Sequence, residues 1–267
     1  MKKVICISLL ILSVLSSCEW KVLPKADDEA AHIQIERYDR LQSRYLTTGD
    51  FSALQQMNTD YPIATRTLVE KMLQLGAVDE PNIQEKFLAF YQDSVLQALI
   101  NDAEAEYANM EDLNRDFVSA FLKLRGWLPD LPIPSIYAQI GALDQSVVVG
   151  DASIGISLDK YMGPTYPLYK KYYSPAQAAT MTRSYIVPDC LSFYLLSLYP
   201  LPRYTNRTQL EKDLHMGKVM WVVNNAIGRH FFKSDYVIKV DNYMKRHPSK
   251  TVQELLDLDD YSVFIDK

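Results

Sequence analysis

Apolar residues recur at three- and four-residue intervals through much of the chain, a spacing typical of amphipathic helices. In the N-terminal half this pattern predicts helices over residues 27–46, 51–57, 64–75, 83–107 and 113–124. In the C-terminal half it predicts helices over residues 176–198, 206–227, 236–245 and 252–257. Proline and glycine residues separate these segments, as is usual between helices. The pattern therefore predicts a mainly helical protein.

Between residues 134 and 158 the pattern changes to β-branched residues that alternate with polar or small ones. Three short runs of this kind are centred on Ala138, Val148 and Ile156, and turn-forming residues such as Gly150 separate them. This alternation is typical of half-buried strands joined by short turns. It predicts a small antiparallel β meander, and hence an α+β fold that is mainly helical.

The N-terminus has the pattern of a bacterial lipoprotein signal peptide. Lys2 and Lys3 precede an apolar run over residues 4–15, which is too short to span about 30 Å of hydrocarbon. The run ends in Leu15-Ser16-Ser17-Cys18, which resembles a lipobox, the motif whose cysteine is acylated and becomes the new N-terminus. The alternative is an ordinary secretory signal with a chance cysteine.

This processing defines the expected organisation of the chain. Residues 1–17 form the signal peptide, Cys18 carries lipid such as palmitate, and residues 18–26 form a tether, which Pro24 interrupts. A single domain is expected over residues 27–267. Membrane lipid is then the partner of the acylated Cys18, because two or more acyl chains anchor a protein stably.

The charge balance makes a role in nucleic-acid binding unfavourable. The 267 residues include 28 Lys and Arg against 33 Asp and Glu, for a formal net charge of −5. Proteins that bind nucleic acid neutralise phosphates with surplus basic side chains, and this chain has no such surplus. We expect no nucleic-acid partner.

The sequence carries no recognisable catalytic motif. It lacks the His-Glu-x-x-His pattern of zinc peptidases, a Gly-x-Ser-x-Gly elbow, a phosphate-binding glycine loop and a Cys-x-x-Cys pair. Cys190 lies in an apolar stretch, which predicts a buried side chain and not a nucleophile. We therefore predict no catalytic residue, metal ligand or cofactor, although four histidines leave a composite metal site as an alternative.

Tyrosine is unusually frequent, with 18 residues, several of them in the segment from Tyr161 to Tyr173. A tyrosine side chain has an apolar body and a polar tip, which suits a half-hydrated groove or a partner interface. The candidate interaction surface comprises Asp159, Tyr161, Tyr166, Tyr169 and Tyr172. The alternative is a tyrosine-lined edge of the core. Gly163 is expected to adopt a backbone conformation that other residues resist, with Asp159 capping the turn.

Several segments resemble one protein family. Ile154–Gly163, followed by Tyr166 and Tyr169, resembles the Leu-Asp-x-Tyr-Leu-Gly-x-x-Tyr-x-x-Tyr segment of the gliding-motility lipoprotein GldB family of Bacteroidetes. The start of a helix, a Leu-x-x-x-x-x-x-Gly-Lys helix and the tail of that family are similar to residues 185–189, 208–218 and 243–256. The resemblance covers roughly residues 130–260.

The resemblance implies a cell-envelope lipoprotein, anchored to the outer or alternatively the inner membrane, with envelope proteins as partners. It implies a non-enzymatic role in a motility- or secretion-related assembly. The family is also related in pattern to zinc peptidases, and Met216 stands where an acidic ligand would be expected beside Gly217 and Lys218. The implied scaffold is thus a degenerate zincin-like one. Two alternatives remain: a glycan- or peptide-binding lipoprotein, and a metal-dependent hydrolase with a rearranged site.

Overall fold

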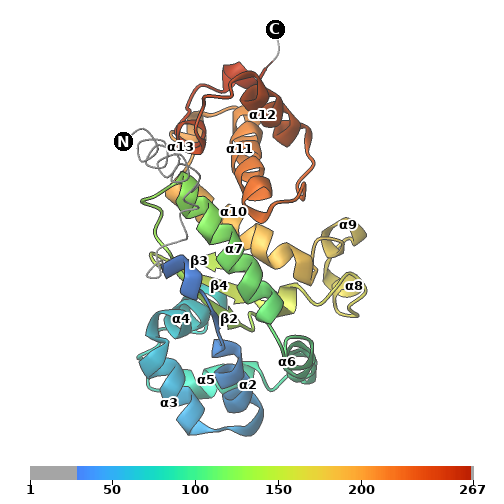
Figure 1. Cartoon of the computed structure of the whole chain (residues 1–267). Helices are drawn as coiled ribbons and strands as arrows, with labels where there is room; N and C mark the ends of the chain where they lie inside the picture. Colours follow the sequence, from blue (N-terminus) through green and yellow to red (C-terminus); the bar gives the residue numbers. More distant parts are fainter. Residues whose placement is uncertain (1–28, 266–267) are drawn as a thin grey trace, which may run out of the picture.

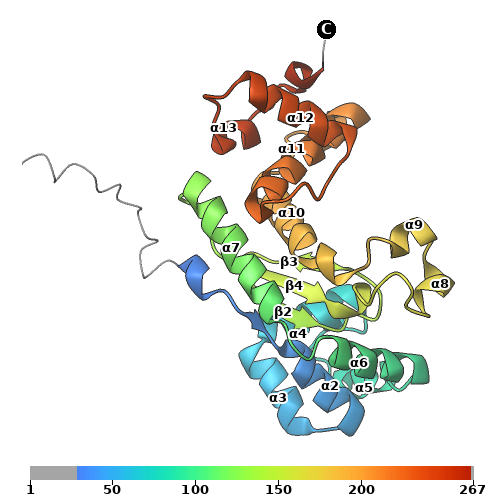
Figure 2. The ribbon, with the colours of Figure 1, turned by 45° about the vertical axis from the view of Figure 1, so that its right-hand side comes forward.

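A computed structural model describes residues 29–265 of the chain. The expected signal peptide, the lipidation site Cys18 and the tether 18–26 lie outside the described residues, so these predictions stay predictions. The described part is mainly helical and contains a small mixed sheet, which confirms the α+β class. Figures 1 and 2 show the sheet in the middle of the molecule, with one group of helices below it and another above it.

The lower group of helices comes from the N-terminal half. Its elements are α2 (Tyr38–Thr48), α3 (Phe51–Asp60), α4 (Pro62–Arg66), η2 (a π-helix, Thr67–Met72), α5 (Ile83–Phe90) and α6 (Ser94–Glu106). The short η1 (Glu29–His32) precedes them and packs against the helix over residues 111–127. The helix predicted over residues 83–107 is interrupted, because the Asp93 carboxylate accepts the backbone N–H of Val95 and starts α6 anew. A cap of this kind marks a helix start regardless of the apolar spacing around it.

The first predicted helix, over residues 27–46, is also divided. A two-residue strand, β1 (Ile35–Glu36), separates η1 from α2. The Ile35 backbone N–H donates to the Asn114 side chain at 3.0 Å, and β1 pairs with a strand that lies a hundred residues further along the chain. Tertiary pairing therefore overrides the local helical pattern here.

The sheet corrects the predicted antiparallel meander. Its strands are β1, β2 (Ser135–Gln139), β3 (Val147–Val149) and β4 (Ser153–Ser157), and within the described residues their order is β1-β2-β4-β3. The β1–β2 and β2–β4 pairs are parallel, and only β3–β4 is antiparallel. The predicted strand positions are thus confirmed, but the predicted strand order is wrong, because β4 lies between β2 and β3.

Side chains from distant parts of the sequence hold the chain just after β2. The Ile140 carbonyl accepts hydrogen bonds from the Tyr91 hydroxyl at 2.8 Å and from the Gln42 amide at 3.2 Å, and the Ile140 N–H donates to Gln42. These bonds direct residue 140 towards the lower helices. The following loop leads away from β2, so β3 is added at the outer edge beyond β4.

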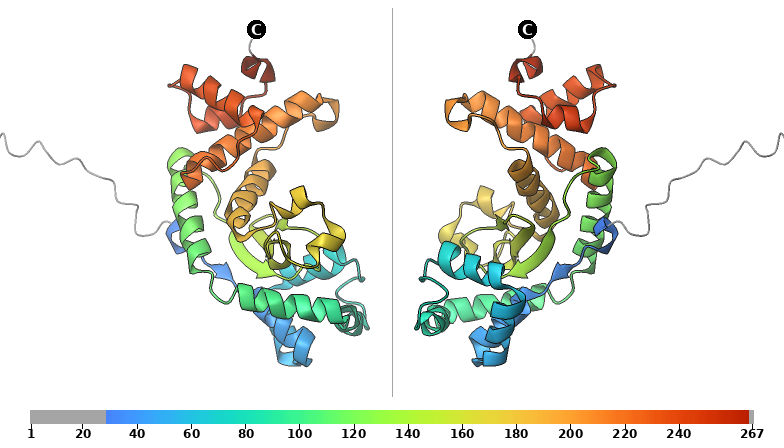
Figure 3. Two further views of the ribbon diagram at one scale, coloured as in Figure 1. Left: turned by 90° about the vertical axis from the view of Figure 1, so that its right-hand side faces the viewer. Right: turned by 90° about the vertical axis from the view of Figure 1, so that its left-hand side faces the viewer.

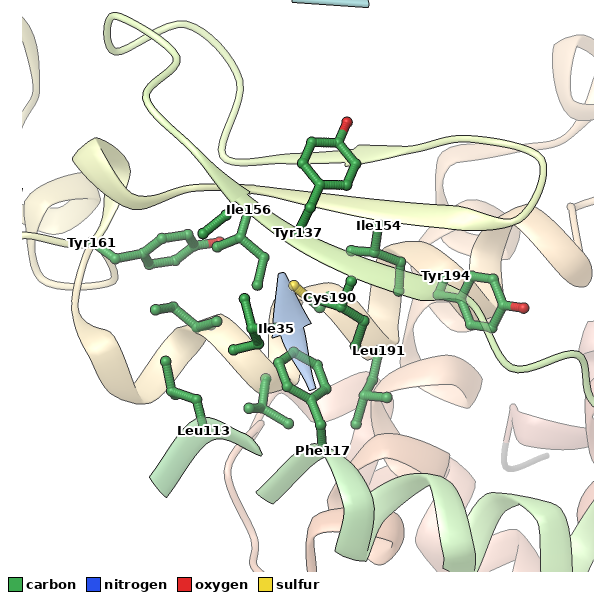
Figure 4. Packing of buried hydrophobic residues seen from close by; sticks show 14 of the residues in the cluster. Ile35, Leu113, Phe117, Tyr137, Ile154, Ile156, Tyr161, Cys190, Leu191 and Tyr194 are labelled. Carbon is green, nitrogen blue, oxygen red and sulfur yellow. The ribbon is translucent and has the colours of Figure 1, made fainter. Parts of the chain in front are cut away.

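The two faces of the sheet meet different helices. Ile154 and Ile156 pack towards Phe117 of α7 (Glu111–Trp127) and Leu191 of α10 (Ile186–Leu198), whereas Tyr137 points to the opposite face, as Figure 4 shows. On that opposite face the Tyr137 ring meets the Tyr38 ring of α2 edge to face, with centroids 6.0 Å apart. One hydrophobic cluster extends through these layers from Ala30 to Phe264.

The remaining elements follow β4. They are η3 (Leu158–Lys160), α8 (Tyr169–Tyr172), α9 (Pro175–Ala178), η4 (Arg183–Tyr185), η5 (Tyr204–Asn206), α11 (Gln209–Ile227), α12 (Asp235–Arg246), α13 (Val252–Leu256) and η6 (Tyr261–Phe264). Figure 3 shows α7 and the part of the chain that carries α8 and α9 on opposite sides of the molecule. Thr251 and Glu254 form a capping box at the start of α13. No helix among residues 29–265 is both long enough and apolar enough to cross a membrane.

Candidate functional site

The tyrosine-rich segment lies where the two central parallel strands end. β2 ends at Gln139 and β4 at Ser157, at the same edge of the sheet, because their residues pair in parallel register. The chain beyond β2 supplies a loop over residues 140–144, and the chain beyond β4 supplies η3 and the tyrosine-rich segment. Ligands in sheets with parallel strands commonly bind outside this edge.

Asp159 holds the loop that follows β2. Its carboxylate accepts the backbone N–H of Gly141 at 2.7 Å and that of Leu143 at 2.5 Å. Ala142 and Leu143 have φ values of 52° and 65°, a left-handed conformation that costs a residue with a side chain about 1–2 kcal/mol. Burial raises the pKa of Asp159, and the two backbone N–H groups oppose that rise. Asp159 thus caps this strained loop, and not the turn at Gly163 that the sequence predicted.

Lys160 and Tyr173 fasten the same loop from the outside. The Tyr173 hydroxyl donates to the Leu143 carbonyl at 2.7 Å, and the Lys160 ammonium donates to the Asp144 carbonyl at 3.2 Å. The ammonium also lies 4.5 Å from the centre of the Tyr173 ring. The polar ends of Lys160 and Tyr173 therefore bind backbone carbonyls of the loop or each other.

Residues 163–182 form a compact excursion, which we call the tyrosine loop. An antiparallel bridge between Met162 and Thr182 closes its neck, and Gly163 in that neck has a φ of 99°. The positive φ confirms the prediction for Gly163. Inside the loop, Tyr169, Ala178 and Met181 form a small hydrophobic cluster of their own.

The structure corrects part of the predicted interaction surface. Asp159 and Tyr169 are fully buried and Tyr161 is 2% exposed, so these residues do not form a surface. Their polar tips are used internally: the Tyr169 hydroxyl donates to the Asp159 carbonyl at 2.6 Å, and the Tyr161 hydroxyl donates to Asp189 at 2.9 Å. The tyrosine spacing alone did not distinguish these positions from exposed ones.

Two of the predicted surface residues do remain at the surface. Tyr166 is half-buried, and its hydroxyl donates to the Asp102 carboxylate of α6 at 2.9 Å. Tyr172 is 61% exposed and its hydroxyl has no partner among the described residues. Whether they contact a partner protein stays a prediction.

Tyr172 stands at the rim of a hollow of about 650 Å³, which we call the tyrosine hollow. Its walls come from the start of α6 (Val95 and Leu96), the strained loop (Ala142 to Asp144) and α8 with its flanks (Leu168 and Lys171 to Tyr173). This volume lies within the range of ordinary ligand sites. The α6 wall is a feature that the sequence analysis missed, and its only local signal is the Asp93 cap.

The Gly-Lys pair in α11 has a structural role. A Cβ atom on Gly217 would lie 2.9 Å from the backbone carbon of Tyr236, so glycine lets α12 pack closely against α11. The buried Lys218 ammonium donates to the carbonyls of Leu256 at 3.2 Å and Leu258 at 2.6 Å, at the end of α13. Burial lowers the pKa of Lys218 to about 8.

Other reactive side chains are enclosed as well. Cys190 is a free and fully buried cysteine, which confirms the prediction, and burial raises the pKa of its thiol well above the usual value. The buried His215 imidazole lies 2.9 Å from the Tyr261 hydroxyl. Among residues 29–265 no group of three His, Cys, Asp or Glu side chains is arranged to hold a metal ion.

Comparison with known proteins identifies the family. The family model described as gliding motility protein GldB matches residues 19–230, which include the sheet, the tyrosine loop and α11. No curated protein matches the chain, and no solved structure matches it. The match covers well over half of the chain and includes the segments 154–169, 185–189 and 208–218 on which the resemblance rested, whereas the tail at residues 243–256 lies outside it. This chain therefore belongs to the gliding motility protein GldB family.

Proposed function

We propose that this protein is a lipid-anchored component of the cell envelope that acts without catalysis, by contacting other proteins of a motility- or secretion-related assembly. Membership of the GldB family supports a role in gliding motility at the envelope. The observation that carries the proposal is the tyrosine hollow, where the exposed Tyr172 stands on a loop held in place by hydrogen bonds of Tyr169 and Tyr173. Rigid tyrosine side chains give a large contact area at low entropic cost.

The bonding and burial of the reactive side chains support a non-enzymatic role. Asp159 is occupied by two backbone N–H groups, and Lys218 by two backbone carbonyls. Cys190 is enclosed by apolar neighbours with its pKa raised, which suppresses the thiolate form. Asp159 and Lys218 thus hold parts of the fold together, and Cys190 is enclosed in the core.

The lipid anchor is the part of the proposal that rests on Leu15-Ser16-Ser17-Cys18. Acylation of Cys18 would hold the protein at a membrane, with the outer membrane favoured over the inner one. Replacing Cys18 with Ser removes the acylation point, so we expect the variant to leave the membrane fraction while its thermal unfolding stays unchanged. A Cys18→Ser protein that still sediments with membranes after a high-salt wash contradicts the anchor.

The contact role is tested by removing one exposed ring. Tyr172→Ala should keep the stability of the wild type but reduce the recovery of envelope proteins in a cross-linked pull-down, since a true anchor contributes about 2 kcal/mol or more to binding. Tyr204, which is 60% exposed on η5, supplies the matched control as Tyr204→Ala. Equal recovery with all three proteins would exclude the tyrosine hollow as the contact site.

A second candidate function uses the same hollow. Its volume of about 650 Å³ and its aromatic rim favour a soluble glycan or peptide ligand. Ligands that bind only the folded state raise the melting temperature. A rise with soluble envelope glycans or peptides that Tyr172→Ala abolishes would favour this candidate over a protein contact.

A further inference from the structure

A second hollow, of about 460 Å³, lies at the other end of the two central strands; we call it the acidic pocket. Ser135 and Ser153, the first residues of β2 and β4, line it, whereas the walls of the tyrosine hollow include the loop beyond the end of β2. The two hollows share no residue. The acidic pocket is therefore a separate feature of the molecule.

The acidic pocket has an aromatic wall made of Tyr137 and Tyr61. Tyr137 projects from the face of the sheet opposite to the cluster of Ile154 and Ile156 (Figure 4). A Cβ atom on Gly155 of β4 would lie 2.6 Å from Cζ of the Tyr137 ring, so only glycine leaves room for the ring to lie across the neighbouring strand. The sequence thus makes space for this ring.

Tyr38 fixes the two rings of the wall relative to each other. Its ring packs against both, with its centroid 6.0 Å from that of Tyr137 and 5.4 Å from that of Tyr61. Tyr38 is itself fully buried and donates its hydroxyl proton to Thr65. The wall is consequently preorganised, which lowers the entropic cost of binding.

Three carboxylates surround this aromatic wall: Glu36, Asp60 and Asp151. All three are exposed, and none of them forms an ion pair with another residue in the part of the chain that the structure describes. Among the described residues that line the pocket there is no Lys or Arg. Burial raises the pKa of Tyr61, and the charge of Glu36, a hydrogen bond to Glu36 and the charge of Asp60 raise it further.

The last wall is aliphatic. Ile63, at the start of α4, is 71% exposed and borders the pocket together with Pro62. A complementary ligand therefore has a positive charge, a flat face for the tyrosine wall and an apolar stem for the isoleucine side. The arginine side chain has all three properties, since its planar guanidinium stacks on aromatic rings and pairs with two carboxylate oxygens at once.

We propose that the acidic pocket receives an arginine side chain from an exposed segment of a partner protein. This inference rests on the proposed function, because it gives the chemistry of one contact within the envelope assembly. A lysine ammonium would satisfy the carboxylates but has no flat face for the tyrosine wall, so arginine is the better match.

The test uses the purified full-length protein and a fluorescent peptide, acetyl-Gly-Ser-Arg-Ser-Gly, followed by fluorescence anisotropy. A second peptide carries citrulline, which has nearly the shape of arginine without its charge. We expect the arginine peptide to bind at least about tenfold more tightly than the citrulline peptide. Asp151→Asn should weaken binding about threefold, as expected for one exposed ion pair, and Glu36→Gln/Asp151→Asn about tenfold.

Asp79→Asn is the matched control, because Asp79 is exposed, lies outside both hollows and changes the net charge by the same amount. It should leave arginine-peptide binding unchanged. Equal weakening by Asp79→Asn and Asp151→Asn would show general attraction to an acidic protein, and equal binding of the two peptides would show that charge is not recognised. Either result overturns the proposal.

The proposal would also be overturned if the acidic pocket bound another part of this chain or a second copy of it. If Lys21→Gln/Lys25→Gln strengthens peptide binding, the chain's own N-terminal segment competes for the pocket. If Asp151→Asn abolishes a concentration-dependent dimer, a second copy of the chain fills it. The outcome is separable from that of the proposed function, because membrane release by Cys18→Ser and pull-down by Tyr172→Ala depend on residues outside the acidic pocket.

Discussion

The carboxylate of Asp159 accepts the backbone N–H of Leu143 at 2.5 Å, and Leu143 has a φ of 65°. The pair joins the chain after β4 to the chain after β2, across sixteen residues of sequence. A buried acceptor of this kind offsets the strain of a left-handed leucine, because the N–H group would otherwise lose its partner on folding. The loop that lines the tyrosine hollow therefore depends on this carboxyl group, in addition to Lys160 and Tyr173.

Asp159→Asn tests this dependence. An amide keeps one acceptor oxygen, but its NH₂ group would face one of the two backbone N–H donors, which leaves that donor unpaired. We expect the free energy of unfolding in urea to fall by about 1–3 kcal/mol. Asp144→Asn, an exposed neighbour, should change it by less than about 0.5 kcal/mol. Similar values for both variants would contradict the role of Asp159.

Gly163 and Gly126 form a second matched pair. A Cβ atom at either position meets nothing within 4 Å, so the two differ in backbone conformation and not in available space. Gly163 has a φ of 99°, and Gly163→Ala should destabilise the protein by about 1–3 kcal/mol. Gly126 lies within α7, and Gly126→Ala should stabilise it by about 0.5–1 kcal/mol. Urea midpoints that shift in the same direction would refute the argument.

The ionisation of Asp189 predicts a pH dependence of stability. Burial raises the pKa of Asp189 to about 6, although the Tyr161 hydroxyl, which donates to it, acts in the opposite direction. Because the folded pKa exceeds the unfolded one, this carboxyl group favours the folded state most below about pH 4. That contribution is lost as the pH rises through about 6.

Asp189→Asn should therefore gain stability relative to the wild type, by roughly 2 kcal/mol, as the pH rises from about 4 to 7. Burial lowers the pKa of His215 to about 4, which gives an opposite trend in the same pH range. His215 is present in both proteins, so the difference between their urea midpoints isolates Asp189. A difference that does not change with pH would disprove the assignment.

The helices were largely predictable from the sequence, and the sheet was not. Apolar spacing located α7 and α11 to within a few residues, because each helix buries one of its faces. The path of the chain after β2 involves instead Gln42 and Tyr91, which are far away in sequence and donate hydrogen bonds to the Ile140 carbonyl. Alternation shows that a segment is a strand, but it does not show which strand lies beside it.

The candidate site was predictable only as a region. Tyr169 and Tyr172 lie three residues apart in the same segment, yet one is fully buried and the other is 61% exposed. The two side chains differ in their hydrogen-bond partners. The Tyr169 hydroxyl donates to the Asp159 carbonyl and accepts the Met162 N–H, whereas the Tyr172 hydroxyl has no partner among the described residues. Such partners are set by the tertiary fold, so composition located the segment and could not rank its residues.

The tyrosine loop has a small apolar cluster of its own, and hydrogen bonds from Tyr166, Tyr169 and Tyr173 join the loop to the rest of the molecule. Its small cluster of Tyr169, Ala178 and Met181 is distinct from the main core, and the bridge between Met162 and Thr182 closes it at the neck. A substitution of the exposed Tyr172 on its rim should therefore leave the packing of the main core unchanged. Selection can change what the rim recognises while the scaffold keeps its folding free energy, so specificity and foldability evolve on separate parts of one chain.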